Sequence, residues 1–155
     1  MNISKQSAGI LLYRNINNYL EVFLVHPGGP FFKNKDEGAW SIPKGEYLED
    51  EDPLIAAKRE FFEETGMQII DGDFIKLQPV KLKSGKVVSA WAVEGDIDAE
   101  NIQSNVFEME WPPRTGKMAR FAEVDRAAWF EAEVAKIKIN PAQVALIDEL
   151  ESVVL

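Results

Sequence analysis

The sequence contains no cysteine and only one histidine, His26, so several kinds of site are excluded at the outset. Disulfide bonds and thiolate zinc sites both need cysteine and cannot form here. The phosphate-binding pattern G-x-x-x-x-G-K-[ST] and the dinucleotide-binding pattern G-x-G-x-x-G are also absent from the sequence. Chemistry in this chain therefore has to rest on carboxylates, lysines, arginines and backbone groups.

Positive charge is scarce: 17 lysines and arginines stand against 26 aspartates and glutamates, and the net charge at pH 7 is −9. This sign disfavours nucleic-acid binding through phosphate contacts, and a phosphorylated small molecule would need cations to mediate its binding. The sequence shows no basic N-terminal region followed by an apolar stretch, and no apolar run of membrane-spanning length. We therefore expect a cytoplasmic monomer or homodimer whose partner is a small-molecule nucleotide, with no nucleic acid and no membrane as partners.

The length of 155 residues and the apolar content of 46% are those of one globular domain, which we expect to cover residues 1–155. Strands alternate with helices along the chain, which favours the α/β class with a mixed sheet flanked by helices. The expected strands cover residues 7–14, 19–26, 74–83, 87–94 and 120–124. The expected helices cover residues 54–65, 131–137 and 141–150. Residues 101–110 are expected to be irregular or to contain a short helix, and residues 111–116 to form a loop.

The helix over residues 54–65 has the clearest start and stop signals in the chain. Asp52-Pro53 is a typical start, because Asp accepts from free N–H groups and Pro at the first position gives up only a donor without a partner. Gly66 is a typical end, because glycine readily adopts the left-handed conformation. The residues between them contain no helix breaker, so we expect one continuous helix.

Three glutamates of this helix, Glu60, Glu63 and Glu64, fall within about a quarter to a third of its circumference. Carboxylates at this spacing repel one another and weaken an isolated helix, so a cation should offset them. Arg59 and Lys58 supply part of that charge, and a divalent metal ion bound by carboxylate oxygens would supply the rest. The alternative interpretation is an acidic helix face that is simply solvated.

The same residues belong to a longer pattern, G-x5-E-x7-R-E-U-x-E-E-x-G-U, in which U is a bulky apolar residue. The pattern runs from Gly45 to Met67 with every fixed position present. The chain therefore resembles the Nudix hydrolases, whose signature box has this form. The resemblance implies a Nudix-type α/β/α sandwich. It also implies metal-dependent hydrolysis of a phosphoanhydride bond in a nucleoside diphosphate linked to another moiety.

The resemblance assigns roles to residues of the box. It implies that Glu60, Glu63 and Glu64, together with the backbone carbonyl of Gly45, bind magnesium or manganese. Such ions neutralise a pyrophosphate and lower the pKa of a water that attacks phosphorus. Whether Glu60 or a carboxylate outside the box acts as the base is left open.

Two more assignments follow from the resemblance. Glu51 and Arg59 are expected to form a structural ion pair that braces the loop against the helix. A further catalytic carboxylate is expected before a Trp-Phe pair, where Glu123 is the candidate and Asp125 the reserve. Two other carboxylates are less favoured: Glu108 and Glu110.

The segment before the box bears on the substrate. Residues 40–45 read W-x-x-P-K-G, which resembles Nudix members that cleave dinucleoside polyphosphates and members that cleave diphosphoinositol polyphosphates. The acidic stretch over residues 46–52 argues against a densely phosphorylated inositol. Lys44 is a candidate substrate contact, with a solvated surface lysine as an equal alternative. Trp40 is expected to pack in the core.

Two functional alternatives remain at this point. The box alone also serves nucleoside triphosphate pyrophosphohydrolases, so a triphosphate is the second candidate substrate. A catalytically silent Nudix-fold nucleotide sensor is the alternative from another functional class, although no box carboxylate has been lost.

Three cationic or titratable residues outside the box are candidates for holding substrate. Arg114 and Lys117 lie in a Pro-Gly loop, and His26 ends a strand beside Pro27. A lone histidine is more often structural, but the loop after His26 is expected on the same side of the molecule as the box.

Overall fold

A computed structural model describes residues 5–69 and 71–155, in which seven strands form a central mixed sheet. Five strands follow the order β4-β6-β1-β2-β9, while β3 pairs with β1 and β5 with β6. The strands of this sheet are β1 (Gln6–Ile16), β2 (Tyr19–Pro27), β3 (Lys44–Glu46), β4 (Ile75–Lys76), β5 (Val80–Lys81), β6 (Val87–Glu94) and β9 (Val124–Glu131). The helices are α1 (Pro53–Thr65), α2 (Ala132–Lys138) and α3 (Val144–Val154), with short 3-10 turns η1 (Ala99–Asn101) and η2 (Pro141–Gln143).

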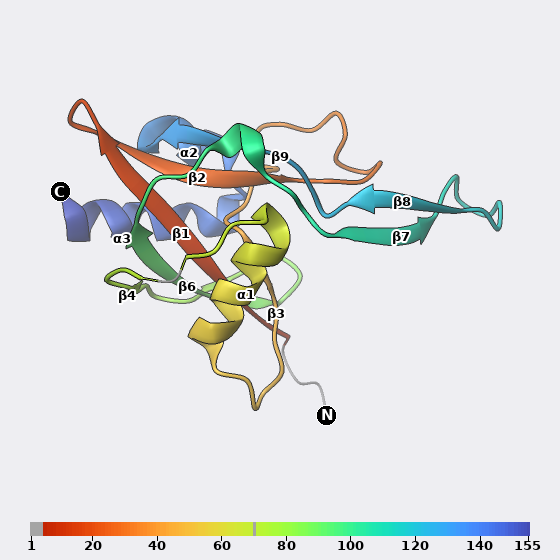
Figure 1. Cartoon of the computed structure of the whole chain (residues 1–155), viewed down its shortest axis with the longest axis horizontal. Helices are drawn as coiled ribbons and strands as arrows, with labels where there is room; N and C mark the ends of the chain where they lie inside the picture. The colour runs from red at the N-terminus through yellow and green to blue at the C-terminus, as the bar shows by residue number, and fades with distance from the viewer. Residues whose placement is uncertain (1–4, 70) are drawn as a thin grey trace.

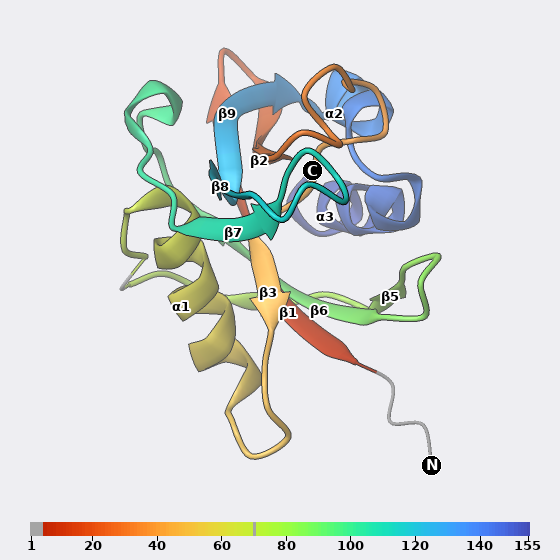
Figure 2. The same cartoon turned by 90° about the vertical axis from the view of Figure 1, so that its right-hand side faces the viewer.

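The elements form three layers, with α1 on one face of the sheet and α2 and α3 on the other (Figures 1 and 2). Strand β1 lies in the middle and pairs in parallel with β6 and antiparallel with β2. Both faces of β1 are covered, which explains why its sequence is a nearly continuous apolar run instead of an alternating one. The expected α/β/α sandwich with a mixed sheet is confirmed. No helix in the described residues is long and apolar enough to cross a lipid bilayer.

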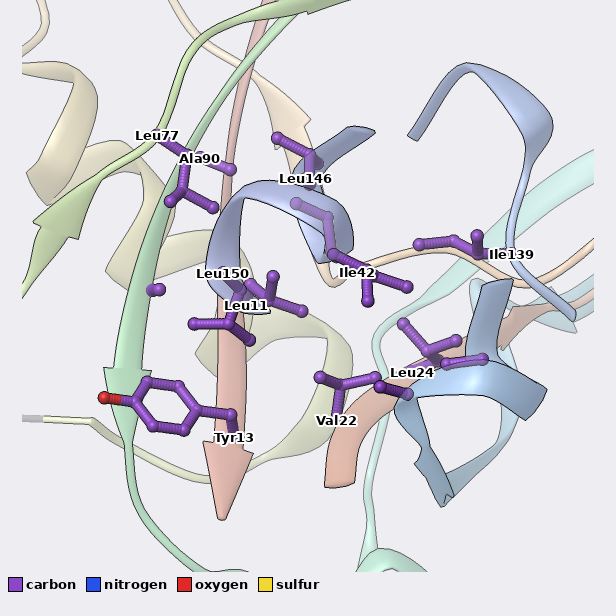
Figure 3. Packing of buried hydrophobic residues seen from close by; sticks show 14 of the residues in the cluster. Leu11, Tyr13, Val22, Leu24, Ile42, Leu77, Ala90, Ile139, Leu146 and Leu150 are labelled. Carbon is purple, nitrogen blue, oxygen red and sulfur yellow. The ribbon is translucent and has the colours of Figure 1, made fainter. Parts of the chain in front are cut away.

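The core beneath α3 is built from side chains that alternate along the central strands. Leu11 of β1 and Val22 and Leu24 of β2 are fully buried, and they face Leu146 and Leu150 of α3 (Figure 3). Trp40 is also buried in this layer, and its indole N–H donates to Asp36 at 2.8 Å. The expectation that Trp40 packs in the core is confirmed.

The core beneath α1 uses the opposite side chains of the same strands. Ile10 and Leu12 of β1 face Ala57 and Phe61 of the helix, and the Phe61 ring lies 5.9 Å from that of Phe23. All of these side chains are fully buried. The packing fixes one face of α1 on the sheet, so the glutamates on its other arc are held at a defined position and angle.

The ends of α1 follow the signals in the sequence. The Asp52 side chain accepts from the N–H of Ile55 at 3.0 Å, and Pro53 takes the first helical position. Gly66 has φ 77° and its N–H donates to the carbonyl of Phe62 at 2.7 Å. The predicted helix and both of its predicted caps are confirmed.

Residues 101–110 differ from the expectation of an irregular or helical segment. Strand β7 (Val106–Glu110) pairs antiparallel with β8 (Met118–Ala122) to form a two-stranded hairpin that projects from the body of the molecule (Figure 1). Phe107 and Met109 are partly buried and alternate with exposed glutamates. This period of two is a strand signal that was present in the sequence and was missed.

Residues 74–83 also differ, because the expected single strand is broken into β4 and β5. Leu77 still donates to the carbonyl of Ala90 at 2.9 Å, but the N–H of Gln78 donates to the Glu149 side chain at 2.7 Å. Pro79 has no N–H to offer to a neighbouring strand. The ladder is therefore interrupted between the two short strands.

The C-terminal part follows the expectation with shifted boundaries. Residues 127–130, expected to lead into a helix, form the end of β9, and α2 begins at Ala132. Asn140 caps the next turn through its side chain, which accepts from the N–H of Ala142 at 2.9 Å. That turn is the 3-10 element η2, and the regular helix α3 starts only at Val144.

Candidate functional site

The box glycine lies directly against a buried glutamate of α1. Strand β3 places Gly45 opposite Ala8 of β1, next to the helix. A Cβ atom added to Gly45 would stand 2.1 Å from the carboxylate carbon of Glu60, closer than any side chain can approach. Glu60 itself is only 8% exposed. The backbone of the loop and the carboxylate of the helix therefore meet at one point, as a shared ion-binding site requires.

Arg59 forms the ion pair that the resemblance implies. Its Nε donates to Glu51 Oε2 and its Nη2 to Glu51 Oε1, each at 3.1 Å. A guanidinium and a carboxylate in this two-point geometry fix each other's orientation. The loop before α1 is thereby tied to the middle of the helix.

The same arginine makes two further contacts, in keeping with the expectation that it offsets part of the negative charge on the helix. Its Nη1 donates to Glu60 Oε1 at 2.9 Å and lies 3.5 Å from Glu63 Oε1. One guanidinium thus joins the structural carboxylate Glu51 to two of the three glutamates on the acidic arc. The position of Glu63 one turn after Arg59, at i+4, was the signal available in the sequence.

Burial and mutual repulsion hold protons on the acidic arc. Burial, followed by the charge of Glu63, raises the pKa of Glu60 to about 7, although Arg59 opposes the shift. Burial also raises the pKa of Glu64 to about 8, opposed by Lys44 and reinforced by Glu60 and Glu123. Burial and Glu63 raise the pKa of Glu123 as well. These carboxylates are close enough to sense one another's charge.

The ligand atoms gathered here suit a hard divalent cation. They are carboxylate oxygens and a backbone carbonyl, the donor set that magnesium and manganese prefer. Within residues 5–69 and 71–155, however, no three carboxylate or imidazole side chains are grouped around a single point. Arg59 Nη1 accounts for part of this, because it binds an oxygen of Glu60 that an ion would use. The residues fit the metal in chemistry, and their side chains must reorient to bind it.

We expect the acidic arc to make the metal-free protein less stable at high pH. Folded-state pKa values of about 7 for Glu60 and about 8 for Glu64 exceed the ordinary 4.5, so the folded state holds these protons more tightly than the unfolded chain. Their stabilising contribution is complete below the ordinary pKa and is lost as pH rises through 7 to 8. Glu64→Gln should therefore raise the melting temperature more near pH 9 than near pH 5.

Thermal melts in the presence of a chelator measure this effect. The exposed Glu37, replaced by Gln, is the matched control and should shift the melting temperature equally little at both pH values. An equal shift for Glu64→Gln at both pH values would contradict the assigned proton binding.

A short segment outside the box connects α1 to the further carboxylate. Gln103 and Asn105 donate their N–H groups to the carbonyls of Thr65 and Glu63, at 2.8 Å each. The carbonyl of Asn105 then accepts from the N–H of Glu123, also at 2.8 Å. The last carbonyls of the helix are satisfied in this way, and Glu123 is held beside them. Backbone pairing of this kind leaves no motif in the sequence.

The two candidates for the further carboxylate lie in different surroundings. Glu123 is half-buried, its charge raises the pKa values of Glu60 and Glu64, and its own pKa is raised by burial and by the charge of Glu63. Asp125 instead hydrogen-bonds through Oδ1 to the Nδ1 of His26 at 2.8 Å. The geometry favours Glu123 as the additional carboxylate of the site.

His26 is fully buried and both of its ring nitrogens are engaged. Besides Asp125, it contacts the carbonyl oxygen of Lys35 through Nε2 at 2.7 Å. A carbonyl can only accept, so Nε2 carries a proton and donates it. The ring has no free nitrogen for a ligand, and its two contacts tie the loop after β2 to β9. The expectation that His26 contacts substrate stays a prediction.

The structure places the other candidate substrate contacts in two different regions. Lys44 is half-buried beside the acidic arc, where burial and the nearby Lys86 lower its pKa while Glu64 opposes the shift. The loop containing Arg114 and Lys117 forms the tip of the β7–β8 hairpin, away from α1 (Figure 1). Lys44 is therefore the candidate that the fold brings to the carboxylates, and Arg114 is not placed among them.

The less favoured carboxylates belong to the hairpin as well. Glu110 accepts from the backbone N–H groups of Arg114 and Gly116 at 2.9 and 3.2 Å, and Glu108 lies 3.9 Å from the Arg120 side chain. Both serve the local structure of β7 and β8.

Comparison with known proteins identifies the family. The model of the NUDIX domain family matches residues 4–150. The fold is similar to that of the Ap4A hydrolase of C. elegans in a binary complex, with 21% identity over 96% of both chains and a TM-score of 0.67. It is also similar to the NUDIX domain of Shewanella oneidensis NrtR complexed with ADP ribose, with 15% identity over 100% of this chain and 91% of that one and a TM-score of 0.68.

A mutT/nudix family protein from Listeria innocua gives the same result, with 16% identity over 99% of this chain and 96% of that one and a TM-score of 0.63. No match was found among curated proteins. Identities this low show a common fold, while the family model spans nearly the whole chain and includes the complete box. The chain therefore belongs to the NUDIX family and has the fold and the box of a Nudix pyrophosphohydrolase.

Proposed function

We propose that this protein is a metal-dependent hydrolase that cleaves a phosphoanhydride bond in a nucleoside diphosphate linked to another moiety. The observation that carries the proposal is the contact between Gly45 and Glu60, beside three further carboxylates whose charges are coupled to that of Glu60. A solvated acidic face would not bury Glu60 or hold its carboxylate against a loop that leaves no room for a side chain.

Glu60, Glu63 and Glu64, with the carbonyl of Gly45, are the groups proposed to hold magnesium or manganese. Such an ion, when bound, neutralises pyrophosphate charge and lowers the pKa of water at the site. Glu60 and Glu123 are the candidates for accepting the proton of the attacking water, because burial raises the pKa of both carboxyl groups, that of Glu60 to about 7. Lys44 places a positive charge beside Glu64, where it can contact a substrate phosphate.

The proposed substrate is a dinucleoside polyphosphate, with a nucleoside triphosphate as the second candidate. The W-x-x-P-K-G lead-in supports the first, and the similarity in fold to an Ap4A hydrolase is consistent with it. The chain carries a net charge of −9, which is consistent with a substrate that has few phosphates and that binds through cations.

A nucleotide sensor without turnover is the second candidate function. Two observations favour it: a NUDIX domain of similar fold was obtained in complex with ADP ribose, and Arg59 engages carboxylates that catalysis would need free. The complete set of box carboxylates favours the hydrolase over the sensor.

The test is the analysis of products from a panel of nucleotides incubated with magnesium. The panel contains nucleoside triphosphates, diadenosine polyphosphates and a nucleotide sugar, and it compares the wild type with Glu63→Gln. Metal-dependent cleavage that falls by roughly a hundredfold or more in the variant supports the hydrolase and identifies its substrate class.

Glu133 on the surface of α2, replaced by Gln, is the matched control and should retain full activity. Release of pyrophosphate from a triphosphate would favour the second substrate. Nucleotide binding with equal background cleavage in both proteins would overturn the catalytic proposal and favour the sensor.

A further inference from the structure

A cavity of about 560 Å³ lies between the β7–β8 hairpin and the loop that follows β2. The groups that line it and matter for binding are Lys33 of the loop, Trp111, Arg120 and Phe121 of the hairpin, and Asp125 of β9. We propose that this cavity binds one nucleoside monophosphate unit of the substrate, an inference that rests on the proposed function.

The cavity borders the chain segment that carries Glu123. Ala122 lines it, and the next residue is Glu123. The N–H of Gly28 donates to the carbonyl of Glu123 at 2.8 Å, and a Cβ on Gly28 would stand 1.9 Å from the carbonyl oxygen of Ala122. The loop after β2 is therefore packed directly on the chain that holds Glu123. A ligand that reaches both places needs to span only a short distance, as a nucleoside and its phosphates do.

Aromatic rings lie at the cavity, and part of their surface is not covered by other protein groups. Trp111 and Phe31 meet edge to face with ring centroids 5.5 Å apart, yet Phe31 remains 60% exposed. Phe121 packs against Phe107 of the facing strand at 5.9 Å and lines the cavity wall. Exposed aromatic surface of this kind offers a platform on which a base can stack. Stacking is favourable in water and accepts any of the bases.

Asp125 provides a fixed hydrogen-bond acceptor in the same cavity. Its Oδ1 is held by the buried His26, while its side chain stays 37% exposed and lines the cavity wall. His26 in turn is fixed by the carbonyl of Lys35. A carboxylate oriented from behind in this way suits the amino group of a base or the hydroxyls of a ribose, both of which donate.

Two cations lie among the same lining groups. Lys33 comes from the loop and Arg120 from the hairpin, where the side chain of Arg120 lies 3.9 Å from Glu108. In a chain of net charge −9, two cations in one cavity lining supply positive charge for a phosphate. Rings, an acceptor and cations correspond to the base, the ribose and the phosphate of a nucleotide.

Another cavity, of about 640 Å³, is less suited to this ligand. Asp96, Asp98 and Glu100 line it, and its only cation among the described residues, Arg14, is already paired with Glu21 and Asp96. Its acidic lining would repel a phosphate.

Direct binding of adenosine monophosphate to the full-length protein tests the proposal without relying on turnover. Tryptophan fluorescence and amide chemical shifts are followed for the wild type, Trp111→Ala, Trp111→Phe and Asp125→Asn. Met118→Ala is the control, because Met118 is exposed and does not line the cavity. We expect Trp111→Ala to weaken binding by about tenfold or more, while Trp111→Phe keeps a stacking surface and stays within about threefold. Asp125→Asn should also weaken binding, whereas Met118→Ala should not change it.

Two further probes separate the parts of the nucleotide. Ribose 5-phosphate, which has no base, should bind more weakly than adenosine monophosphate and should not respond to Trp111→Ala. The affinity for inorganic phosphate should be lowered by Arg120→Ala and by none of the variants at Trp111, Asp125 and Met118. Circular dichroism checks that each variant is folded. If Trp111→Ala does not fold, the comparison of the wild type with Trp111→Phe and Asp125→Asn still tests the proposal.

The outcomes separate this inference from the proposed function. Metal-dependent hydrolysis in the wild type, with the affinity for adenosine monophosphate and KM both unchanged in Trp111→Ala, overturns the cavity assignment and leaves the hydrolase intact. Absence of hydrolysis, with adenosine monophosphate still bound in a Trp111-dependent way, supports the cavity and overturns the hydrolase. Binding shifts confined to other residues, or no shifts at millimolar nucleotide, overturn the assignment.

Discussion

Replacing Glu64 by Gln is expected to lower kcat by roughly a hundred- to ten-thousandfold while leaving the protein folded. Glu64 is half-buried between Lys44, Glu60 and Glu123, and burial together with its carboxylate neighbours raises its pKa to about 8. Glutamine keeps the shape of the side chain but removes the charge that a divalent cation requires. The measurement is steady-state hydrolysis of the best substrate of the panel over a range of magnesium concentrations.

Stability distinguishes this result from simple unfolding. The same substitution relieves repulsion within the acidic arc, so the metal-free variant should melt at a higher temperature than the wild type near pH 9. A variant that is more stable but less active than the wild type has not lost its activity through unfolding, so the loss is that of a functional group. Full activity in Glu64→Gln would contradict the assignment of Glu64 to the metal site, and a lower melting temperature near pH 9 would contradict its raised pKa.

Gly45→Ala is the second substitution with a large expected effect, and its reason is purely steric. The added methyl group would overlap the Glu60 carboxylate, whose carbon lies 2.1 Å from the ideal Cβ position. Glu60 is the flexible partner, so its side chain should move away from the backbone of β3 while the fold is retained. Displacement of a ligand by about 1 Å can cost roughly a hundredfold in kcat.

A double-mutant cycle shows whether the effect runs through this contact. Gly45→Ala, Glu60→Gln and the combined variant are compared in kcat and in melting temperature. If the methyl group acts by displacing Glu60, the two effects on kcat are strongly non-additive, and the double variant is little worse than Glu60→Gln alone. Independent, additive losses would mean that Gly45 acts elsewhere, and wild-type kcat in Gly45→Ala would contradict the close approach.

The parts of the molecule that were predictable from sequence are those governed by local rules. Asp52, Pro53 and Gly66 set the limits of α1, and the spacing of its glutamates places them on one arc, because capping and helical periodicity depend on neighbours in the chain. The ion pair of Glu51 and Arg59 was expected only through the resemblance to the Nudix hydrolases. The structure contains it with the geometry of a two-point contact.

The parts that were not predictable depend on contacts between distant segments. Residues 103–105 join the end of α1 to Glu123 through backbone groups, which carry no residue preference. The break between β4 and β5 combines Pro79, which the sequence shows, with a hydrogen bond from Gln78 to Glu149, 71 residues away, which it does not. His26 was considered as a substrate contact because its burial and its bond to Asp125 arise only when β2 and β9 pair.

The β7–β8 hairpin was predictable from the sequence only in part. Partly buried Phe107 and Met109 alternate with exposed glutamates, so the period of a strand was visible in the sequence. The Pro-Gly loop that follows was recognised, but it was not recognised as the turn between two strands. The cavity lined by Trp111 and Arg120 depends on this hairpin, and for that reason both residues were missing from the candidates named from the sequence.

The most direct test of the central claim is hydrolysis of a diadenosine polyphosphate in water enriched in the heavy oxygen isotope, with magnesium and with a chelator. We predict that one product phosphate carries the label, that the chelator abolishes turnover and that Glu63→Gln lowers turnover by roughly a hundredfold or more. Turnover that persists in the chelator, or that is equal in the wild type and the variant, would contradict the assignment of the box carboxylates to a metal-dependent phosphoanhydride hydrolase.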